Sequence, residues 1–367
     1  MYSLNPGHLF PAVQRGLSPA ETLLTKMNLG AGGALLMSAF LSPPPAWTFG
    51  AVGAAGALLN VAPGPRSVAR WAAVGYRRLR EKTAPAAVFD RPGATATWEL
   101  YPEHGTMQDP LRRAAFHDAF SRALTFAGGQ ARTAGIQVHV THRATVDDYV
   151  THGQTISVHV PKGLAGQPDR ILGTLEGEVA RLGALMPVEP DPVPAVAERG
   201  PGWVLLDDGR YAATARVTAW PDDTDGDLMQ RLLLGDGHAD RQDPHFTVDR
   251  SFAVLYRPLP PAQSRRSAKW RAALAGAFTT DTVKKAAHEI ASSTTHGALV
   301  QGAILVDVDA YLTVWGDSPE SVSDARWHAS LTADRHRIRL DWLAGQQHRA
   351  HVMTTPHGAS TRKGAIL

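Results

Sequence analysis

An acidic run in this 367-residue sequence has the composition of a calcium-binding loop. The run reads DDTDGDL and holds Asp222, Asp223, Asp225 and Asp227. An EF-hand loop needs glycine at its sixth position and glutamate at its twelfth. Gly226 is only the fourth residue counted from Asp223, and no glutamate follows at the required place. We therefore predict that Asp222, Asp223 or Thr224 caps a following helix, where the helix dipole favours acidic side chains.

Four histidines could together suggest a zinc site, because they lie on or beside two expected strands: His139, His142, His152 and His159. His139 and His142 are three residues apart, so they point to opposite faces of one strand. They would not share a metal ion, and we interpret the four as satisfied surface histidines. We expect no metal site and no cofactor.

Catalytic motifs are not found in the sequence. There is no GxxxxGK[ST] loop, no GxSxG elbow and no HExxH pair. Cysteine is absent, which excludes thiol nucleophiles, thiolate metal sites and disulfides, and fits a cytoplasmic body. We predict no catalytic residues and no enzymatic activity. An enzyme whose site is assembled from distant parts of the chain stays open as an alternative.

A basic run interleaved with tryptophan could contact phosphate, acidic lipid or a protein partner: Arg265, Arg266, Lys269, Trp270 and Arg271. A solvated helix face is the commoner explanation for such a run. The net charge is only +3, and basic residues concentrate after an apolar segment. This distribution favours a membrane surface over nucleic acid as the partner, so direct nucleic-acid binding is not expected.

That apolar segment is the most unusual element of the chain. Residues 27–65 contain no Asp, Glu, Lys, Arg or His. Three prolines at 43–45 divide the segment into two arms, residues 27–41 and 46–62. We predict a transmembrane helical hairpin whose bulky side chains contact the lipid bilayer. These membrane-anchoring residues are Leu35, Leu36, Phe40, Trp47, Phe49, Leu58 and Leu59.

The apolar segment has three other interpretations. The arms have at most the length of a short spanning helix, roughly 17 residues or more, and Gly and Ala insert weakly, so a buried soluble hairpin remains an alternative. A cleavable signal peptide fits poorly, because the apolar run is double and follows Glu21 and Lys26. A dinucleotide-binding loop is excluded, because position 35 is leucine where the fingerprint requires glycine.

Basic residues flank the hairpin and define its expected orientation. Six follow it in a juxtamembrane helix at 66–83: Arg66, Arg70, Arg77, Arg78, Arg80 and Lys82. The positive-inside rule then places both termini in the cytoplasm at a bacterial inner (plasma) membrane, with the proline turn outside. Trp71 and Tyr76 are expected at the headgroup level.

The remaining chain has enough apolar content for two α+β domains. We expect a lead-in at 1–26, a first cytoplasmic domain at 84–186, a proline-rich linker at 187–202, a second cytoplasmic domain at 203–356 and a tail at 357–367. Expected strands are 94–101, 136–141, 155–160, 210–220, 251–258, 303–315, 338–343 and 349–354. Expected helices are 110–127, 168–185, 224–234, 261–292 and 319–333. The pattern predicts two α/β sandwich units, the second of them ferredoxin-like, without a recognisable sequence repeat.

Three segments of the second domain carry a family resemblance: SFAVLYRPLPPAQSRR, VDAYLTVWGDSPESV and RLDWLAGQQHRAHVMTTPHG. Together with the hairpin they resemble actinobacterial membrane proteins of conjugative elements, which are related to the N-terminal, non-ATPase part of type IV secretion ATPases. In those ATPases a motor domain follows. Because the sequence stops at Leu367, the resemblance here implies no motor and no ATP hydrolysis.

The resemblance implies a function in protein transport or conjugation. We expect a non-catalytic scaffold of a conjugative or type IV-like secretion channel, acting as a docking platform for an ATPase or coupling protein. Such a component would belong to a multi-subunit membrane complex or a homo-oligomer. A membrane subunit of a type VII secretion system is the alternative within the same class.

Overall fold

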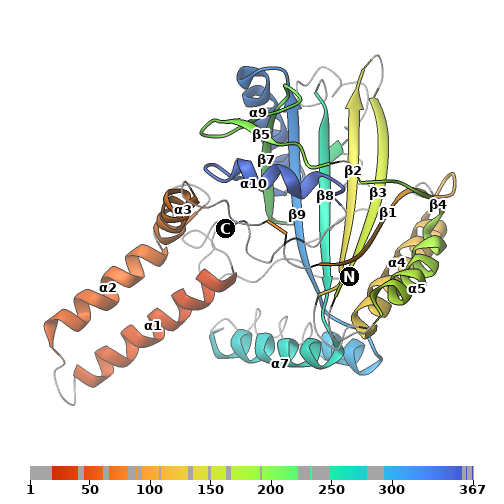
Figure 1. The fold of residues 1–367 in the computed structure, drawn as a ribbon. Helices are drawn as coiled ribbons and strands as arrows, with labels where there is room; N and C mark the ends of the chain where they lie inside the picture. Colours follow the sequence, from red (N-terminus) through yellow and green to blue (C-terminus); the bar gives the residue numbers. More distant parts are fainter. Residues whose placement is uncertain are drawn as a thin grey trace. The chain divides into compact units, whose positions relative to one another are not determined.

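The fold is described from a computed structural model of the chain (Figure 1). The described residues are 19–39, 45–60, 66–81, 88–89, 92–106, 109–130, 135–147, 150–162, 167–190, 192–221, 232–233, 248–278, 293–357, 361 and 366. The helices are α1 (Pro19–Ala39), α2 (Ala46–Asn60), α3 (Val68–Glu81), α4 (Pro110–Gln130), α5 (Pro168–Val179), α7 (Pro261–Phe278), α9 (Pro319–Arg335), α10 (Gln347–Ala350) and the 3-10 turns η1 (Ala180–Leu182) and η4 (His351–Thr354). The strands are β1 (Gly93–Tyr101), β2 (Gln137–Val146), β3 (Val150–Pro161), β4 (Ala184–Pro187), β5 (Val196–Arg199), β6 (Val204–Leu206), β7 (Tyr211–Ala219), β8 (Arg250–Pro258), β9 (Val306–Gly316) and β10 (Arg339–Trp342).

The chain divides into two compact units, each described here by itself. Residues 1–86 and 273–288 belong to the first, which we call the helical unit after α1, α2 and α3. Residues 87–272 and 289–366 belong to the second, which we call the sheet unit.

In the helical unit, α1 and α2 run side by side as a hairpin, red and orange in Figure 1. The expected pair of apolar helices is thus confirmed, although α1 begins at Pro19 and so includes Glu21 and Lys26. At the start of α2, the Thr48 amide and hydroxyl both donate to the Pro45 carbonyl, at 2.9 and 2.6 Å. Among the described residues, no helix unites the length and the apolarity needed for crossing a membrane.

The sheet unit is built on one antiparallel sheet of ten strands. Its order is β4-β1-β3-β2-β8-β9-β7-β6-β5, and β10 also pairs with β7. The predicted linker at 187–202 therefore does not separate two independent sheets. β2, from the predicted first domain, pairs with β8 from the second over seven residue pairs, from Val138↔Tyr256 to Ala144↔Arg250. Part of the predicted linker forms β5.

The two halves of the sheet have the same strand order when each is followed from its outer edge to the centre. One half reads β4-β1-β3-β2 and the other β10-β7-β9-β8, with antiparallel neighbours throughout. Helix α4 connects β1 to β2, α5 connects β3 to β4, and α9 connects β9 to β10. The halves differ in the connection between their second and third strands. β3 starts four residues after β2 ends, whereas α7 and a second helical stretch at 293–300 come between β8 and β9.

The hydrophobic core lies on the face of the sheet that α4, α5 and α9 cover. Val138, Val140 and Ile156 pack with α4 and α5 in the first half. Phe252 and Leu312 pack with α9 in the second half. Along β2, Val138 and Val140 alternate with the polar residues Gln137, His139 and Thr141, as the period of two requires. Of the helices that cover them, α4 was predicted from the three- and four-residue spacing of its apolar residues.

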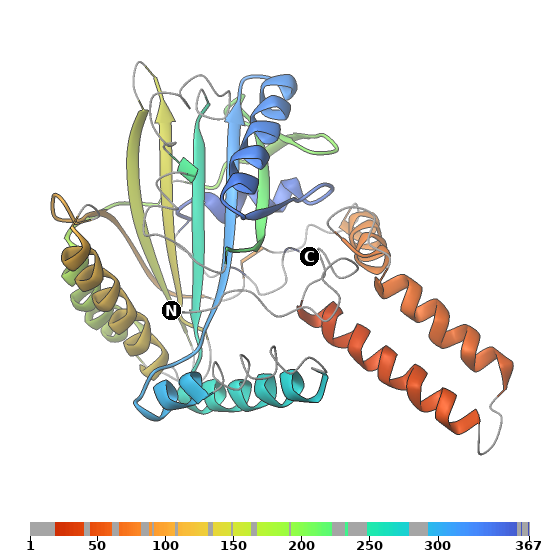
Figure 2. The same cartoon turned by 180° about the vertical axis from the view of Figure 1, so that it is seen from behind.

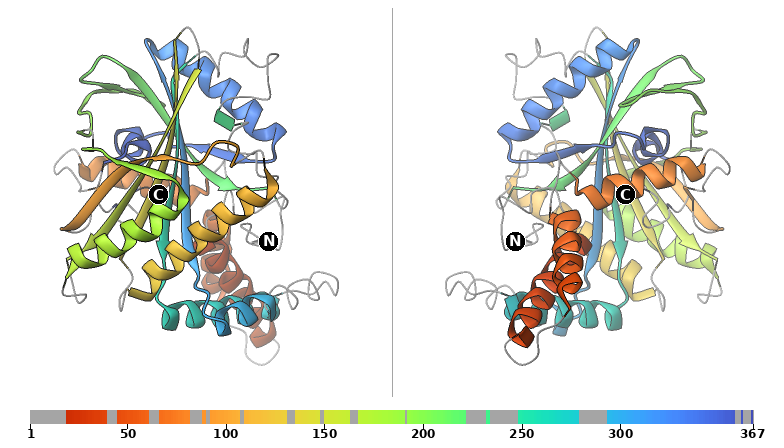
Figure 3. Two further views of the ribbon diagram at one scale, coloured as in Figure 1. Left: turned by 90° about the vertical axis from the view of Figure 1, so that its right-hand side faces the viewer. Right: turned by 90° about the vertical axis from the view of Figure 1, so that its left-hand side faces the viewer.

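The opposite face of the sheet is covered by the C-terminal segment. Leu255 and Tyr311 on this face cluster with Leu343, Ala350 and Met353. Figure 3 shows α9 and α10 on opposite sides of the sheet. The strand predicted at 349–354 is wrong, because these residues form the end of α10 and η4. The helix predicted at 168–185 also ends early. The chain passes through Gly183 into β4, and only glycine fits there, because a Cβ would collide with the Tyr101 carbonyl.

Candidate functional site

The candidate site is the outer surface of the α1–α2 hairpin. Large apolar side chains are exposed on both helices: Met27, Leu36, Met37, Trp47, Phe49 and Leu58. The exposed fraction reaches 71% for Met37 and 72% for Trp47. Met27 and Leu36 are nine residues apart, so at about 100° per residue they point to opposite sides of α1. The apolar surface is therefore not confined to one stripe of the helix, as it is in a helix that packs on a core through one face.

Four of the predicted membrane-anchoring residues are exposed: Leu36, Trp47, Phe49 and Leu58. Leu35 is partly buried. Phe40 and the Leu59 side chain lie outside the described residues.

Polar side chains of the hairpin bond to its own backbone. Asn28 Nδ2 donates to the Val52 carbonyl at 3.3 Å, which links the two helices. Ser38 Oγ donates to the Leu35 carbonyl at 2.8 Å, and Thr48 bonds to Pro45 as described above. A polar group without water needs a partner in the protein, because an unpaired one in an apolar medium costs several kcal/mol, roughly 4 to 8. These side chains meet that requirement.

The predicted basic helix is confirmed as α3, but its arginines are not distributed as expected. Arg66 and Arg70 are buried, at 0% and 8% exposed, rather than surface side chains. Arg66 places its guanidinium over the Trp71 ring, 4.9 Å from the centroid, a favourable cation–π contact. Arg77 is partly exposed. Lys82 and the side chains of Arg78 and Arg80 lie outside the described residues.

The second basic run lies on α7. Arg265, Arg266 and Lys269 are exposed, whereas the side chains of Trp270 and Arg271 lie outside the described residues. Ser264 fixes the start of the helix: its hydroxyl donates to the Leu259 carbonyl and accepts from the Leu305 amide, both at 3.0 Å. The run is thus held on an ordered turn and remains a candidate contact surface.

The histidines separate as the strand period predicts. His142 lies on one side with its ring nitrogen 3.2 Å from that of His152. His139 and His159 are buried on the other side, where the His139 ring stacks on His357 at 5.1 Å. They are core histidines and not surface ones. Burial lowers the pKa of His139 to about 4, against a weaker opposing effect of the bond from its Nε2 to the Met353 carbonyl.

A charged group lies on the same face of the sheet as His139 and was not foreseen from the sequence. Asp309 on β9 accepts from Arg216 on β7 and, at 2.5 Å, from Arg257 on β8. Burial alone would raise the pKa of Asp309, but the two arginines outweigh it and lower the pKa. The three residues are far apart in sequence, so only the pairing of β8 and β7 with β9 reveals the group.

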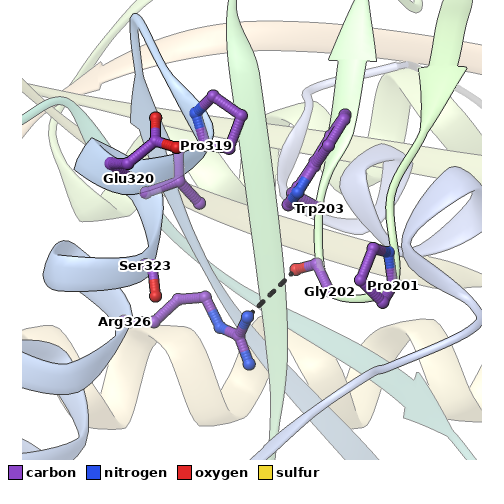
Figure 4. Close-up of a pocket in the computed structure, with 8 residues that line it drawn as sticks. Pro201, Gly202, Trp203, Pro319, Glu320, Ser323 and Arg326 are labelled. Carbon is purple, nitrogen blue, oxygen red and sulfur yellow. Dashed lines mark hydrogen bonds between the residues drawn. The ribbon is translucent and has the colours of Figure 1, made fainter.

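One pocket opens beside the start of α9, with a volume of about 350 Å³ (Figure 4). Its apolar lining residues are Pro201, Trp203, Pro319 and Val322, and Glu320 and Arg326 are its charged residues. Arg326 Nη1 donates to the Gly202 carbonyl at 3.4 Å, so the arginine braces one wall. A single carboxylate without a neighbouring histidine does not form an acid–base pair.

The acidic run at 222–227 lies outside the described residues. Within the part of the chain that the structure covers, no three His, Cys, Asp or Glu side chains are arranged to hold a metal ion. A comparison with models of known protein families gives no match, and no curated protein matches the chain.

Proposed function

We propose that this protein is a membrane-attached, non-catalytic docking component of a conjugation-type or type IV-like secretion channel. The α1–α2 hairpin is its membrane anchor at the bacterial inner membrane, with both chain ends on the cytoplasmic side. The sheet unit is the platform that receives an ATPase or coupling protein. The observation that carries this proposal is the all-round apolar surface of the hairpin.

Hydrocarbon explains that surface better than water does. Leaving side chains of the size of Trp47 and Leu36 in water forgoes about 1.5 to 3 kcal/mol each relative to burial. The exposed patch continues around both helices, and the internal hydrogen bonds of Asn28, Ser38 and Thr48 leave their side chains without a need for solvent. A bilayer, which surrounds a helix on all sides, satisfies both conditions.

The platform part of the proposal is supported by topology. We propose that each half of the sheet unit is ferredoxin-like, because each has the strand order expected of a split βαβ arrangement, and the helices α4, α5 and α9 connect strands as that fold requires. Folds of this type serve many functions, so the secretion assignment itself depends on the sequence resemblance of residues 251–266, 308–322 and 339–358.

Membrane attachment is tested by fractionation of cells that produce the full-length protein. We expect it in the membrane pellet after an alkaline carbonate wash. A variant with Leu36→Asp and Trp47→Asp should shift to the supernatant, whereas Val300→Asp, at a site 75% exposed in the sheet unit, should not. Full-length protein in the supernatant without detergent would refute the proposal.

The partner is tested by purification in detergent. We expect a tagged protein to co-elute with a type IV secretion ATPase or a coupling protein. Charge reversal of Arg265, Arg266 and Lys269 on α7 should weaken that co-elution if the basic run is the contact. Co-elution with a type VII secretion ATPase would instead support the alternative assignment.

A further inference from the structure

Among the described side chains of α3, large apolar ones are exposed and Arg70 is buried. Its exposed residues include Ala72, Tyr76 and Leu79, whose spacing of four and three places them on one face. Tyr76 and Leu79 are 67% and 69% exposed. Its opposite face carries the buried residues Arg70 and Val74. An amphipathic helix in water shows the reverse arrangement, with charges outside and apolar residues inside.

We propose that α3 lies in the plane of the membrane interface, with the Ala72, Tyr76 and Leu79 stripe in contact with the acyl chains of a phospholipid bilayer. This inference rests on the proposed membrane attachment of the hairpin and adds a second, separate contact with the same bilayer. Of the two aromatic residues that the sequence predicted at the headgroup level, Tyr76 belongs to this stripe and Trp71 does not. Trp71 is only partly exposed and lies under the Arg66 guanidinium.

Continuity with the hairpin supports lipid as the occupant. Helix α3 packs against α2 within the helical unit, so a bilayer that receives α2 comes close to α3. The exposed large hydrophobic residues described in this unit lie on all three helices. A bilayer surface can contact the exposed apolar residues of all three helices at once.

The residues of the stripe suit the interface. Tyrosine is enriched at the level of the lipid headgroups, because its ring is apolar and its hydroxyl is polar. Leu79, one turn further along, supplies an aliphatic side chain, and Ala72 and Ala73 let the backbone approach the lipid closely. The buried arginine pair does not oppose this orientation. The Arg70 amide donates to the Ser67 hydroxyl oxygen at 3.1 Å. The Arg70 side chain is buried on the side of the helix opposite the stripe.

The test uses nitroxide labels on single cysteines, for which the cysteine-free chain is suited. Full-length protein carrying Leu79→Cys, Met37→Cys or Val300→Cys is reconstituted in vesicles of phosphatidylethanolamine and phosphatidylglycerol. A water-soluble nickel chelate is supplied on both sides of the vesicle. Oxygen, which concentrates in hydrocarbon, and the chelate, which stays in water, then report the surroundings of each label by relaxation enhancement.

We expect oxygen, and not the nickel chelate, to enhance the relaxation of labels at Leu79 and Met37. The nickel chelate should enhance the relaxation of the label at Val300. A nickel response at Leu79 alone would overturn the α3 inference and leave the anchor intact. Nickel responses at both Leu79 and Met37 would overturn both proposals. A label at Leu79 that responds to neither reagent would show a protein partner over the stripe, which also overturns the inference.

A second measurement gives the size of the effect. The hairpin alone would hold the chain in the vesicles, so this binding is measured in the Leu36→Asp, Trp47→Asp background, and the control is made in the same background. There, a further Tyr76→Asp, Leu79→Asp exchange should weaken binding to the same vesicles roughly tenfold or more, because two apolar side chains no longer enter the bilayer. The matched control exchanges two exposed leucines of the sheet unit, Leu111→Asp and Leu331→Asp, and should bind as the background variant does. Equal binding of both double variants would contradict a role for the stripe.

Discussion

Val140 and Val254 lie directly opposite each other where β2 pairs with β8. Both are 7% exposed, and each packs into the core of its own half of the sheet unit. This pair therefore joins the two hydrophobic cores across the centre of the sheet. Directly opposed β-branched residues stabilise an antiparallel pair by roughly 0.2 to 1 kcal/mol beyond alanine.

The first prediction concerns this junction. Val254→Ala removes two buried methyl groups and should lower the free energy of unfolding by about 2 kcal/mol, at ~0.8 kcal/mol per carbon plus the cavity left behind. Because the sheet is continuous, amide hydrogen exchange should accelerate equally in β3 and in β9. Faster exchange in β9 alone would mean that the halves unfold independently. Val300→Ala, at an exposed site, is the control.

The second prediction concerns acid stability. The pKa of His139 is about 4 in the folded protein and near its usual 6.5 when unfolded, so the unfolded chain binds the proton more tightly. Stability is therefore fully present above pH 6.5 and is lost as the pH falls towards 4. At ~1.36 kcal/mol per pKa unit the loss amounts to roughly 3 kcal/mol.

The measurement is urea unfolding at a series of pH values. His139→Gln, which cannot take up a proton, should flatten the slope of stability against pH between 6.5 and 4. The exposed His296→Gln should leave the slope as it is. An unchanged slope in His139→Gln would show that another group dominates acid unfolding, and His159 and His357 would be the next to test.

The third prediction concerns Asp309, which is held between Arg216 and Arg257. Asp309→Asn leaves two partly buried arginines without their carboxylate and should destabilise the protein by roughly 2 kcal/mol. This is less than the ~3 to 5 kcal/mol of a fully buried pair, because the Asp309 and Arg216 side chains remain 20% and 29% exposed. The lowered pKa of Asp309 means that its contribution is present above about pH 4 and is lost at lower pH.

Thermal unfolding at neutral pH measures this effect. Asp208→Asn is the matched control, because its bridge to Arg210 lies on an exposed turn and should contribute less than about 1 kcal/mol. Equal losses in the two variants would show that the central group is no stronger than a surface ion pair.

Local pattern was enough to locate most elements. The alternation of Val138 and Val140 predicts β2, and the spacing of Leu111, Phe116 and Phe120 predicts α4. The pairing of β2 with β8 was not predictable, because it joins segments that are more than a hundred residues apart in the sequence. The predicted boundary at the prolines of 187–202 was misleading, since those residues include β5.

For the candidate site, too, the sequence predicted the local elements but not which side chains are buried. The absence of charge in residues 27–65 was sufficient to predict the apolar hairpin. The number of arginines in residues 66–82 did not reveal which of them would be buried, because burial of Arg66 and Arg70 depends on the side of α3 that is covered. Of the two aromatic residues expected at the headgroup level, Tyr76 is exposed and Trp71 is partly exposed.

The last prediction concerns a gap in the pairing of β7. On the side away from β9, β6 pairs with Tyr211 and Ala212, and β10 pairs from Ala215 onward. Between them, the Gln347 side chain bonds to the Thr214 backbone: its Oε1 accepts from the amide at 2.7 Å and its Nε2 donates to the carbonyl at 2.9 Å. A side-chain amide thus replaces a strand at this point and turns the chain into α10, where the sequence pattern predicted a strand.

Gln347→Met keeps the length of the side chain and removes both bonds. The Thr214 carbonyl still accepts from the Leu343 amide at 3.1 Å, so the main cost is the buried amide of Thr214, about 1 to 3 kcal/mol. We expect faster exchange of the Thr214 amide and earlier proteolysis after residue 343, because α10 loses its attachment to β7. Gln347→Glu, which keeps the acceptor, should restore protection of that amide in part. If Gln347→Met and Gln347→Glu exchange alike, the amide is protected by burial alone and the side chain does not hold α10 in place.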